Sequence, residues 1–117
     1  MPIVLLYHDV TPAGQDDLSG FPGPGAARYK LQPDEFRAHL DAIQRAAPMP
    51  PAACAIHGPT SPHAWMLTFD DGGSSSVHPI ADMLEERGWR GWFFITTDRL
   101  DTPVFLTRSQ LQDLYRR

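Results

Sequence analysis

The sequence has few of the residues that mark several large classes of protein. Its 117 residues include one cysteine, Cys54, and one lysine, Lys30. One cysteine excludes an intramolecular disulfide framework, and a net charge of −4 offers no basic surface for nucleic acid. No apolar run approaches the roughly 20 residues that cross a bilayer, and residues 1–10 are too short and too uncharged for a secretory signal. We therefore expect a cytoplasmic protein without a nucleic-acid or membrane partner.

The sequence does contain short apolar runs that alternate with helix-like segments. The apolar runs are typical of buried strands and lie at 2–7, 65–69 and 92–96. Helical periodicity predicts helices at 33–47, at 77–87 and from the capping-box pattern at 107–110 onward. Strand, helix and strand in this order predict one α/β domain over residues 1–117, with parallel strands joined by crossover helices.

Two long segments lack any periodicity. Residues 11–29 are rich in glycine, proline and aspartate and predict a loop of the length that often forms a lid or a binding surface. Residues 48–62 are interrupted by prolines, which predicts an irregular connection within the domain.

Two adjacent carboxylates follow the predicted strand 65–69. Ligands bind beyond the carboxyl ends of parallel strands, so Asp70 and Asp71 stand where chemistry is expected. They can serve one site only if the pleat has ended, and Gly72 and Gly73 supply the backbone freedom for that. Because like charges repel at this spacing, a bound divalent cation is the simplest interpretation. An isolated segment of this kind is also an ordinary polar turn.

The segment Thr68-Phe69-Asp70-Asp71-Gly72 resembles the first signature motif of the polysaccharide deacetylases, the NodB-homology domain of carbohydrate esterase family 4. The flanking sequence agrees with this resemblance. Residues 5–10 resemble the family's opening strand, 88–96 the strand after the motif, and 105–114 the helix that leads to the second motif. The resemblance implies the N-terminal part of a distorted (β/α) barrel of the glycoside hydrolase and deacetylase type.

The resemblance also implies an activity. It is the metal-dependent hydrolysis of a non-peptide C–N bond, removing acetyl groups from N- or O-acetylated carbohydrate. Carried over to this sequence, Asp70 is the general base and Asp71 is a ligand of the metal. Zinc is the first expectation for that metal, with cobalt or manganese as alternatives.

One part of the family pattern is missing. Deacetylases of this type complete the metal site with a His-x-x-x-His pair, but no two of the five histidines at 8, 39, 57, 63 and 78 stand four apart. Zinc sites normally use three or four protein ligands, so we expect an incomplete site in an apparently truncated domain that is inactive alone. Three strands cannot close a barrel, and their exposed edges predict self-association.

Two other functions stay open at this point. The missing histidines suit a catalytically dead, carbohydrate-binding relic. Gly72 to Ser76 before a helix suits a Mg²⁺-dependent phosphate-binding domain, although no lysine follows the glycines. His8 is interpreted as a structural histidine that bonds a backbone carbonyl, with a position facing Asp71 at the same rim as the alternative. The three tryptophans, Trp65, Trp89 and Trp92, are interpreted as core residues rather than a sugar platform.

Overall fold

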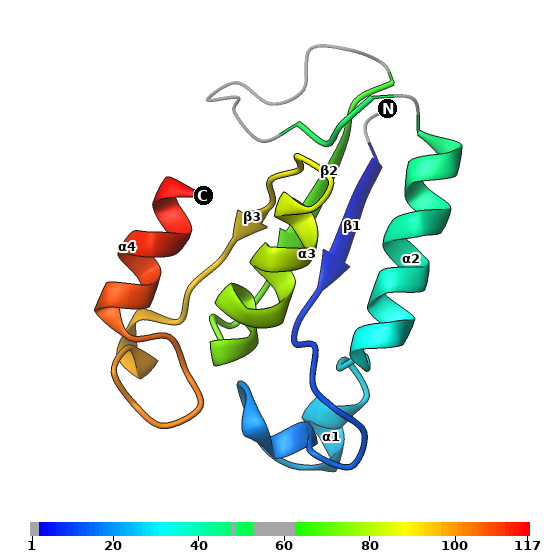
Figure 1. The fold of residues 1–117 in the computed structure, drawn as a ribbon. Coiled ribbons are helices and arrows are strands. Elements are labelled where there is room, and N and C mark those ends of the chain that lie inside the picture. The colour runs from blue at the N-terminus through cyan, green and yellow to red at the C-terminus, as the bar shows by residue number, and fades with distance from the viewer. Residues whose placement is uncertain (1–2, 48, 53–62) are drawn as a thin grey trace.

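A parallel sheet forms the centre of the molecule. The structure is a computed structural model and describes residues 3–47, 49–52 and 63–117. The strands of these residues are β1 (Ile3–Tyr7), β2 (Trp65–Phe69) and β3 (Trp92–Phe93), side by side in this order. All pairs are parallel, with Tyr7 opposite Phe69 and Phe69 opposite Phe93. The predicted α/β architecture is therefore confirmed (Figure 1).

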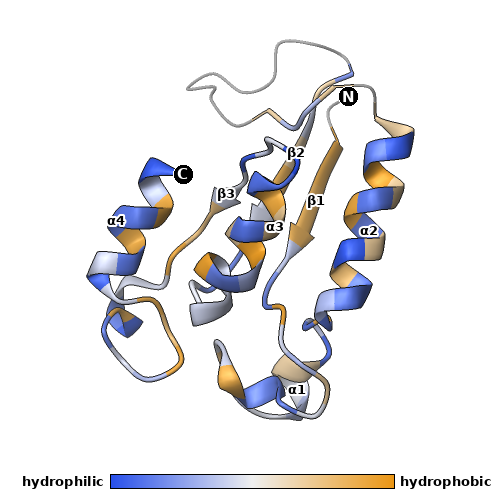
Figure 2. Ribbon diagram, viewed as in Figure 1, coloured by the Kyte–Doolittle hydropathy of each residue, from blue (hydrophilic) through white to orange (hydrophobic). Residues whose placement is uncertain are grey.

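Helix α2 (Pro33–Ala46) covers one face of this sheet. Pro33 occupies the first turn, and the N–H of Gln32 donates to the Glu35 carboxylate at 3.1 Å, which caps the helix start. Phe36 and Leu40 have no exposed surface, while apolar and polar bands alternate along the helix in Figure 2. Burial of these two side chains holds the helix against the strands.

The two faces of the sheet differ in how well they are covered. Leu67 and Phe69 point into the core and are at most 1% exposed, and the rings of Phe69 and Phe93 stack with centroids 4.8 Å apart. On β1, Val4 and Leu6 alternate with the inward residues and are 53% and 55% exposed. The helices thus cover one face and leave apolar side chains of β1 open on the other. The predicted self-association stays a prediction.

The helix predicted over residues 77–87 is only partly present. A wide, π-type turn at Val77–Ala81 comes first, and α3 occupies only Asp82–Glu85. His78 has non-helical angles (φ −133°, ψ 115°) because Pro79, which lacks an N–H, excludes the α region for the residue before it. Ile80, Met83 and Leu84 are nevertheless buried. Gly88 follows the segment at φ +68°, the left-handed conformation that commonly ends a helix.

Two further elements differ in length from the prediction. β3 was expected over residues 92–96, but only Trp92 and Phe93 pair, because their partner strand β2 ends at Phe69. The predicted loop 11–29 contains a 3-10 turn at Asp16–Leu18 and the short helix α1 (Pro24–Ala27). Figure 1 places this segment beyond the carboxyl end of β1.

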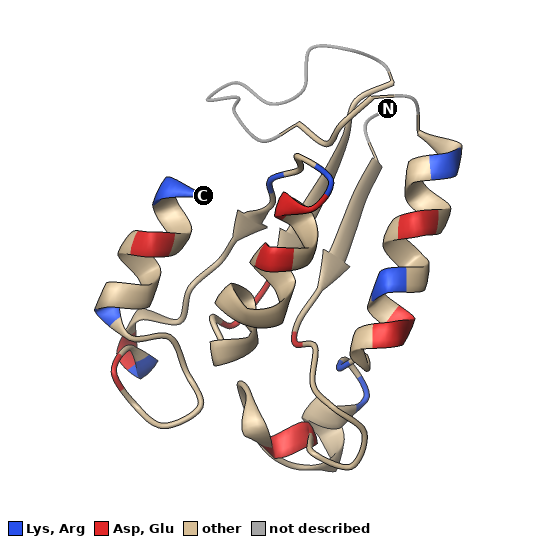
Figure 3. Ribbon diagram, viewed as in Figure 1, with Lys and Arg blue, Asp and Glu red and all other residues tan. Residues whose placement is uncertain are grey.

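The last helix, α4 (Arg108–Arg116), begins with the predicted capping box. The Thr107 hydroxyl accepts from the Gln110 N–H at 3.1 Å, and the Gln110 side chain accepts from the Thr107 N–H at 2.9 Å. Figure 3 shows charged residues along α2, α3 and α4 and in the segments between the elements. Arg117 after α4 bonds the Glu85 carboxylate of α3 at 2.6 Å, and this contact lowers the pKa of Glu85.

Three further points from the sequence concern the tryptophans, the segment that contains Cys54 and His57, and membrane-spanning helices. Trp65 and Trp89 are buried and pack edge to face, as predicted for core residues, whereas Trp92 is only half-buried. Cys54 and His57 lie outside the described residues. Within the described part of the chain, each helix is too short or too polar to cross a membrane.

A core substitution tests how strongly α2 supports the sheet. Leu40→Ala removes a fully buried side chain, and we expect it to lower the free energy of unfolding by about 2–5 kcal/mol. Gln44→Ala on the exposed side of the same helix should change it by less than about 0.5 kcal/mol. Urea denaturation followed by circular dichroism measures both. Equal stabilities of the two variants would contradict this packing.

Candidate active site

Asp70 and Asp71 lie immediately beyond β2, at the carboxyl edge of the sheet. The Asp70 N–H donates to the Tyr7 carbonyl at 2.9 Å, the last bond between the two strands. Asp71 and Gly72 then adopt positive φ values of 79° and 76°. The pleat therefore ends between the two carboxylates, as predicted. A non-glycine residue at positive φ is uncommon and is found most often at functional sites and turns.

Gly72 and Ile95 fix the turn against the neighbouring strand. A Cβ on Gly72 would lie 3.1 Å from Ile95 Cγ2, so the backbone passes close to this side chain. The Thr96 N–H donates to the Asp71 carbonyl at 3.2 Å. Residues 97–99 follow as a 3-10 turn, which puts the segment after β3 beside the carboxylates, as the parallel order predicts.

Asp71 borders two hollows. The first, of about 240 Å³, is lined by the ends of β1 and β2 together with the segment 21–30, through His8, Asp9, Phe21, Tyr29, Lys30 and Asp71 among others. The second, of about 430 Å³, is lined by both carboxylates and by the residues after β3, Phe94, Ile95 and Thr96. Asp71 is thus the residue that both hollows share.

His8 follows β1 and lines the first hollow beside Asp71. Its ring packs against Tyr29 with centroids 5.0 Å apart. The preferred interpretation was a bond to a backbone carbonyl, but the structure supports the alternative, a position at the rim with Asp71. His39 and His78 have partners elsewhere: His39 bonds the Tyr7 hydroxyl at 3.3 Å, and His78 pairs with Asp82.

Beneath the carboxylates is a buried polar network that sequence reasoning missed. Asp9 Oδ1 accepts hydrogen bonds from the hydroxyls of Ser19 at 2.6 Å and Ser75 at 2.8 Å. Each hydroxyl in turn accepts a backbone N–H: the Ser75 N–H bonds Ser19 Oγ at 2.8 Å, and the Val10 N–H bonds Ser75 Oγ at 3.1 Å. All three side chains are at most 3% exposed. We call Asp9, Ser19 and Ser75 the Asp9 cluster.

The Asp9 cluster joins segments that are far apart in the sequence. It connects the end of β1, the loop around Ser19 and the turn after Asp71. Asp9 Oδ2 has no hydrogen-bond partner among the described residues and is buried, which normally costs about 1–3 kcal/mol. A buried carboxylate with one unpaired oxygen adds negative potential next to Asp71.

The long loop is fastened at its base by Lys30. The Lys30 ammonium donates to the carbonyls of Asp16 at 2.5 Å, Ser19 at 2.7 Å and Phe21 at 2.7 Å. All three N–H donors of the side chain are therefore engaged by backbone. The loop was predicted as a lid or binding surface, and the structure places it as one wall of the first hollow.

Burial is the largest influence on the pKa of Asp71 and raises it. The charges of Asp9 and Asp70 raise this pKa further, whereas the positive charges of His8 and Lys30 lower it. The net shift is upward. This direction is expected where carboxylates are crowded in a partly desolvated place, and a bound cation would oppose it.

The described residues do not by themselves form a metal centre. In 3–47, 49–52 and 63–117, no group of three or more histidine, cysteine, aspartate and glutamate side chains is arranged to hold an ion. Asp71 can supply one carboxylate ligand.

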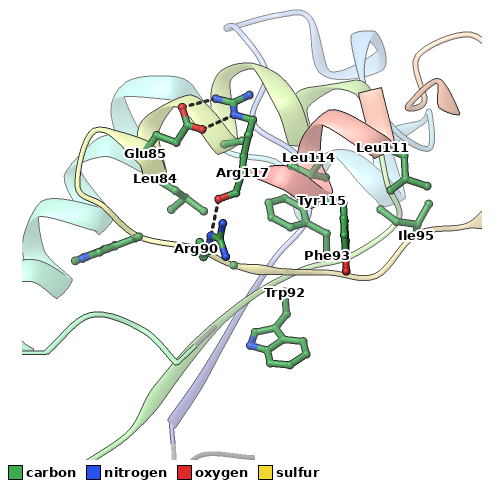
Figure 4. Close-up of a pocket in the computed structure, with 13 residues that line it drawn as sticks. Leu84, Glu85, Arg90, Trp92, Phe93, Ile95, Leu111, Leu114, Tyr115 and Arg117 are labelled. Carbon is green, nitrogen blue, oxygen red and sulfur yellow. Dashed lines mark hydrogen bonds and ion pairs between the residues drawn. The ribbon is translucent and has the colours of Figure 1, made fainter. Parts of the chain in front are cut away.

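A further hollow of about 460 Å³ lies between α3, β3 and α4, away from the carboxylates (Figure 4). Its walls are mainly apolar and include Leu84, Phe93 and Leu114, and the Arg117–Glu85 ion pair lies at its edge. Within this group of residues, no pair of acids and bases resembles a catalytic arrangement. The hollow is a packing groove between the helices.

The comparisons with known proteins agree on one family. The sequence profile described as polysaccharide deacetylase matches residues 57–117, just over half of the chain. Among solved structures, IcaB from Ammonifex degensii is 19% identical with a TM-score of 0.70, over 98% of this chain and 48% of its own. A de-N-acetylase from Aggregatibacter actinomycetemcomitans is 18% identical with a TM-score of 0.72, over 98% and 50%.

A polysaccharide deacetylase from Bacillus cereus is 15% identical with a TM-score of 0.72, over 98% of this chain and 35% of its own. At these identities the likeness shows the fold, and it confirms the predicted α/β fold of the deacetylase type. The chain spans half or less of the length of these structures. No curated protein matched the sequence.

The Asp9 cluster leaves no room for a side chain at residue 73. A Cβ there would lie 2.1 Å from Asp9 Oδ1 and 2.6 Å from Ser19 Oγ, so Gly73→Ala should lower the free energy of unfolding by about 1–3 kcal/mol. Gly25→Ala is the matched control, because no atom lies within 4 Å of its added Cβ. Urea titration distinguishes them. A Gly73→Ala protein as stable as the control would contradict the described packing.

The influence of His8 on Asp71 can be measured without any metal. The charge of His8 is an influence that lowers the pKa of Asp71, so its removal in His8→Ala should raise this pKa further. His39→Ala, an exposed histidine that is not among the influences on Asp71, should leave this pKa unchanged. Carboxyl ¹³C NMR titration reports the pKa directly. A downward shift in the His8 variant would contradict the placement of this side chain.

Proposed function

The chain belongs to the polysaccharide deacetylase family, and we propose that it serves the removal of acetyl groups from N- or O-acetylated carbohydrate. The observation that carries the proposal is the position of Asp70 and Asp71. Both follow β2 at the carboxyl edge of a parallel sheet, within the segment that resembles the family's first motif. The family profile and the deacetylase-type fold support the same chemistry.

Hydrolysis of an amide requires a nucleophilic water, a polarised carbonyl and a protonated leaving amine. We propose Asp70 as the general base that accepts the proton of the attacking water. Asp70 is half-buried and lines the second hollow, so it faces the space that a substrate would occupy. His8 lines the first hollow and could donate a hydrogen bond to the substrate from the other side of Asp71.

We propose Asp71 as a ligand of a divalent metal, with zinc first and cobalt or manganese as alternatives. Such an ion polarises a carbonyl and lowers the pKa of a bound water. The crowding of Asp9, Asp70 and Asp71, which raises the pKa of Asp71, is relieved by a cation. Because the described residues do not complete a metal site, the proposal requires further ligands from outside them.

The phosphate-binding alternative fits the structure poorly. It needs free backbone N–H donors between Gly72 and the following turn. The Ser74 N–H instead donates to the Val104 carbonyl at 3.0 Å, and the Ser75 N–H donates to Ser19 at 2.8 Å. The Ser76 N–H donates to the Gly73 carbonyl at 3.0 Å. These donors are engaged within the fold, so an anion would have to displace them.

Because the described residues do not complete a metal site, the test compares the chain with a version that carries additional metal ligands. We propose that the 117-residue chain alone releases little acetate from N-acetylglucosamine oligomers, with or without Zn²⁺. A version extended by a segment that carries a His-x-x-x-His pair should release acetate in a metal-dependent manner. In that version Asp70→Asn should lower the rate about 10²–10⁴-fold through loss of the general base. Asp71→Asn should lower it by weakening metal binding.

Asp34→Asn is the control for the loss of one surface carboxylate, since Asp34 is exposed on the first turn of α2 and lines neither hollow beside Asp71. Coupled enzymatic detection of acetate measures the rates, and circular dichroism confirms the folding of each variant. Unchanged acetate release in Asp70→Asn would contradict the base assignment. Activity that survives both a chelator and Asp71→Asn would contradict the metal assignment.

A further inference from the structure

Val104 has a backbone conformation that its own side chain disfavours. Its φ is +62°, in the left-handed region, where a β-branched residue is a genuine outlier. Pro103 precedes it, and the Phe105 N–H donates to the Thr102 carbonyl at 3.3 Å, which is the pattern of a type II turn. The third position of such a turn, held here by valine, calls for glycine. Strain of this kind persists where the surrounding structure enforces it and is found most often at functional sites.

The Val104 carbonyl joins two segments of the candidate active site. It accepts the Gly20 N–H at 2.9 Å and the Ser74 N–H at 3.0 Å, so both of its lone pairs are used. Gly20 belongs to the long loop that forms one wall of the first hollow, and Ser74 belongs to the turn after Asp71. The strained residue therefore connects the loop directly to the turn that carries Asp71.

The residues that follow Val104 also pair with the turn after β2. Phe105 and Gly73 form an isolated antiparallel bridge, and the Leu106 N–H donates to the Gly72 carbonyl at 3.0 Å. The side chains of Phe105 and Leu106 are both buried. Because these buried residues come directly after the strained turn, Val104 cannot relax to an ordinary conformation without moving them.

Side chains reinforce the connection to the loop. The rings of Phe21 and Phe105 pack edge to face with centroids 5.1 Å apart. The Arg99 guanidinium lies 5.4 Å from the centroid of Phe21 and 5.9 Å from that of Phe105, close enough for cation–π attraction to both rings. Phe21 lines the first hollow, so these contacts hold a wall residue of that hollow against the segment after β3.

We propose that Val104 is a positioning residue of the candidate active site. Its carbonyl, directed by the strained turn, fixes the long loop and the turn after Asp71 in one arrangement. At an ordinary negative φ the carbonyl would point elsewhere and lose both N–H donors. This inference rests on the proposed deacetylase function, and Val104 acts in it through Gly20 and Ser74 rather than on the substrate.

Hydrogen exchange of single backbone amides in the 117-residue chain tests the connection. Val104→Pro is the disruptive variant, because proline fixes φ at about −65° and cannot adopt +62°. The Gly20 and Ser74 amides should then exchange about fivefold faster or more, the effect of losing one ordinary hydrogen bond. The Trp89 amide, which donates to the Leu84 carbonyl at 2.9 Å, is the internal reference and should keep its rate.

Val104→Gly is the matched variant at the same residue. Glycine adopts positive φ without steric strain, so the turn and both hydrogen bonds should remain. The Gly20 and Ser74 amides should exchange as slowly as in the unaltered chain, and the midpoint of urea denaturation should not fall. A lower midpoint would contradict a strained turn at Val104.

Acetate release by the version extended with a His-x-x-x-His pair distinguishes positioning from a purely stabilising role. Under conditions in which circular dichroism shows the variant to be folded, Val104→Pro should lower kcat/KM about 10- to 100-fold, because a small displacement at a site suffices for such a loss. Val104→Gly should release acetate at the rate of the unaltered version, because it keeps the carbonyl in place.

The outcomes separate this inference from the proposed function. Unchanged exchange of the Gly20 and Ser74 amides in folded Val104→Pro would overturn the inference even if the extended version is active, and so would undiminished acetate release by that variant. If the extended version with Val104 releases no acetate, the proposed function fails, and the exchange rates still decide whether Val104 connects the two segments. If Val104→Pro does not fold, the urea midpoint of Val104→Gly decides, and a value below that of the unaltered chain overturns the inference.

Discussion

The buried carboxylate of Asp9 is the contact on which the geometry of the candidate site depends. By accepting the hydroxyls of Ser19 and Ser75, it ties the end of β1 to the long loop and to the turn after Asp71. Gly20 and Gly73 make this possible, because a Cβ at either residue would lie 2.2 Å or less from an Asp9 oxygen. His8, Tyr29 and Asp71 therefore face one hollow although they are distant in sequence.

The regular parts of the fold were predictable because their signals are local. The apolar run of β2, the amphipathic stripe of α2 and the capping box of Thr107 each depend on residues within a few positions. The predicted element lengths were wrong where one residue, or the length of a partner strand, influenced the structure more than hydrophobic periodicity did. In the helix predicted over residues 77–87, the segment around Pro79 forms a wide turn instead of a regular helix. The pairing of β3 is short because its partner strand β2 ends at Phe69.

The site was predictable only in part, for a similar reason. Asp70 and Asp71 stand together in sequence after a strand, so their place at the sheet edge followed from the pattern. Ser19 and Ser75 are 10 and 66 residues from Asp9, and no periodicity connects them. Serine and aspartate in glycine-rich segments resemble ordinary turn residues. Their role, to bond Asp9 and so connect the loop to the end of β1, can be recognised only in the folded structure.

The central claim is that Asp71, beside His8 at the edge of the sheet, binds a divalent cation. Paramagnetic broadening of backbone amide signals by substoichiometric Mn²⁺ tests it most directly in this chain. The account predicts the strongest broadening at residues 8–9 and 70–73, and its loss in Asp71→Asn. Broadening centred on the acids of α3, Asp82 and Glu85, or an identical pattern in Asp71→Asn, would contradict it.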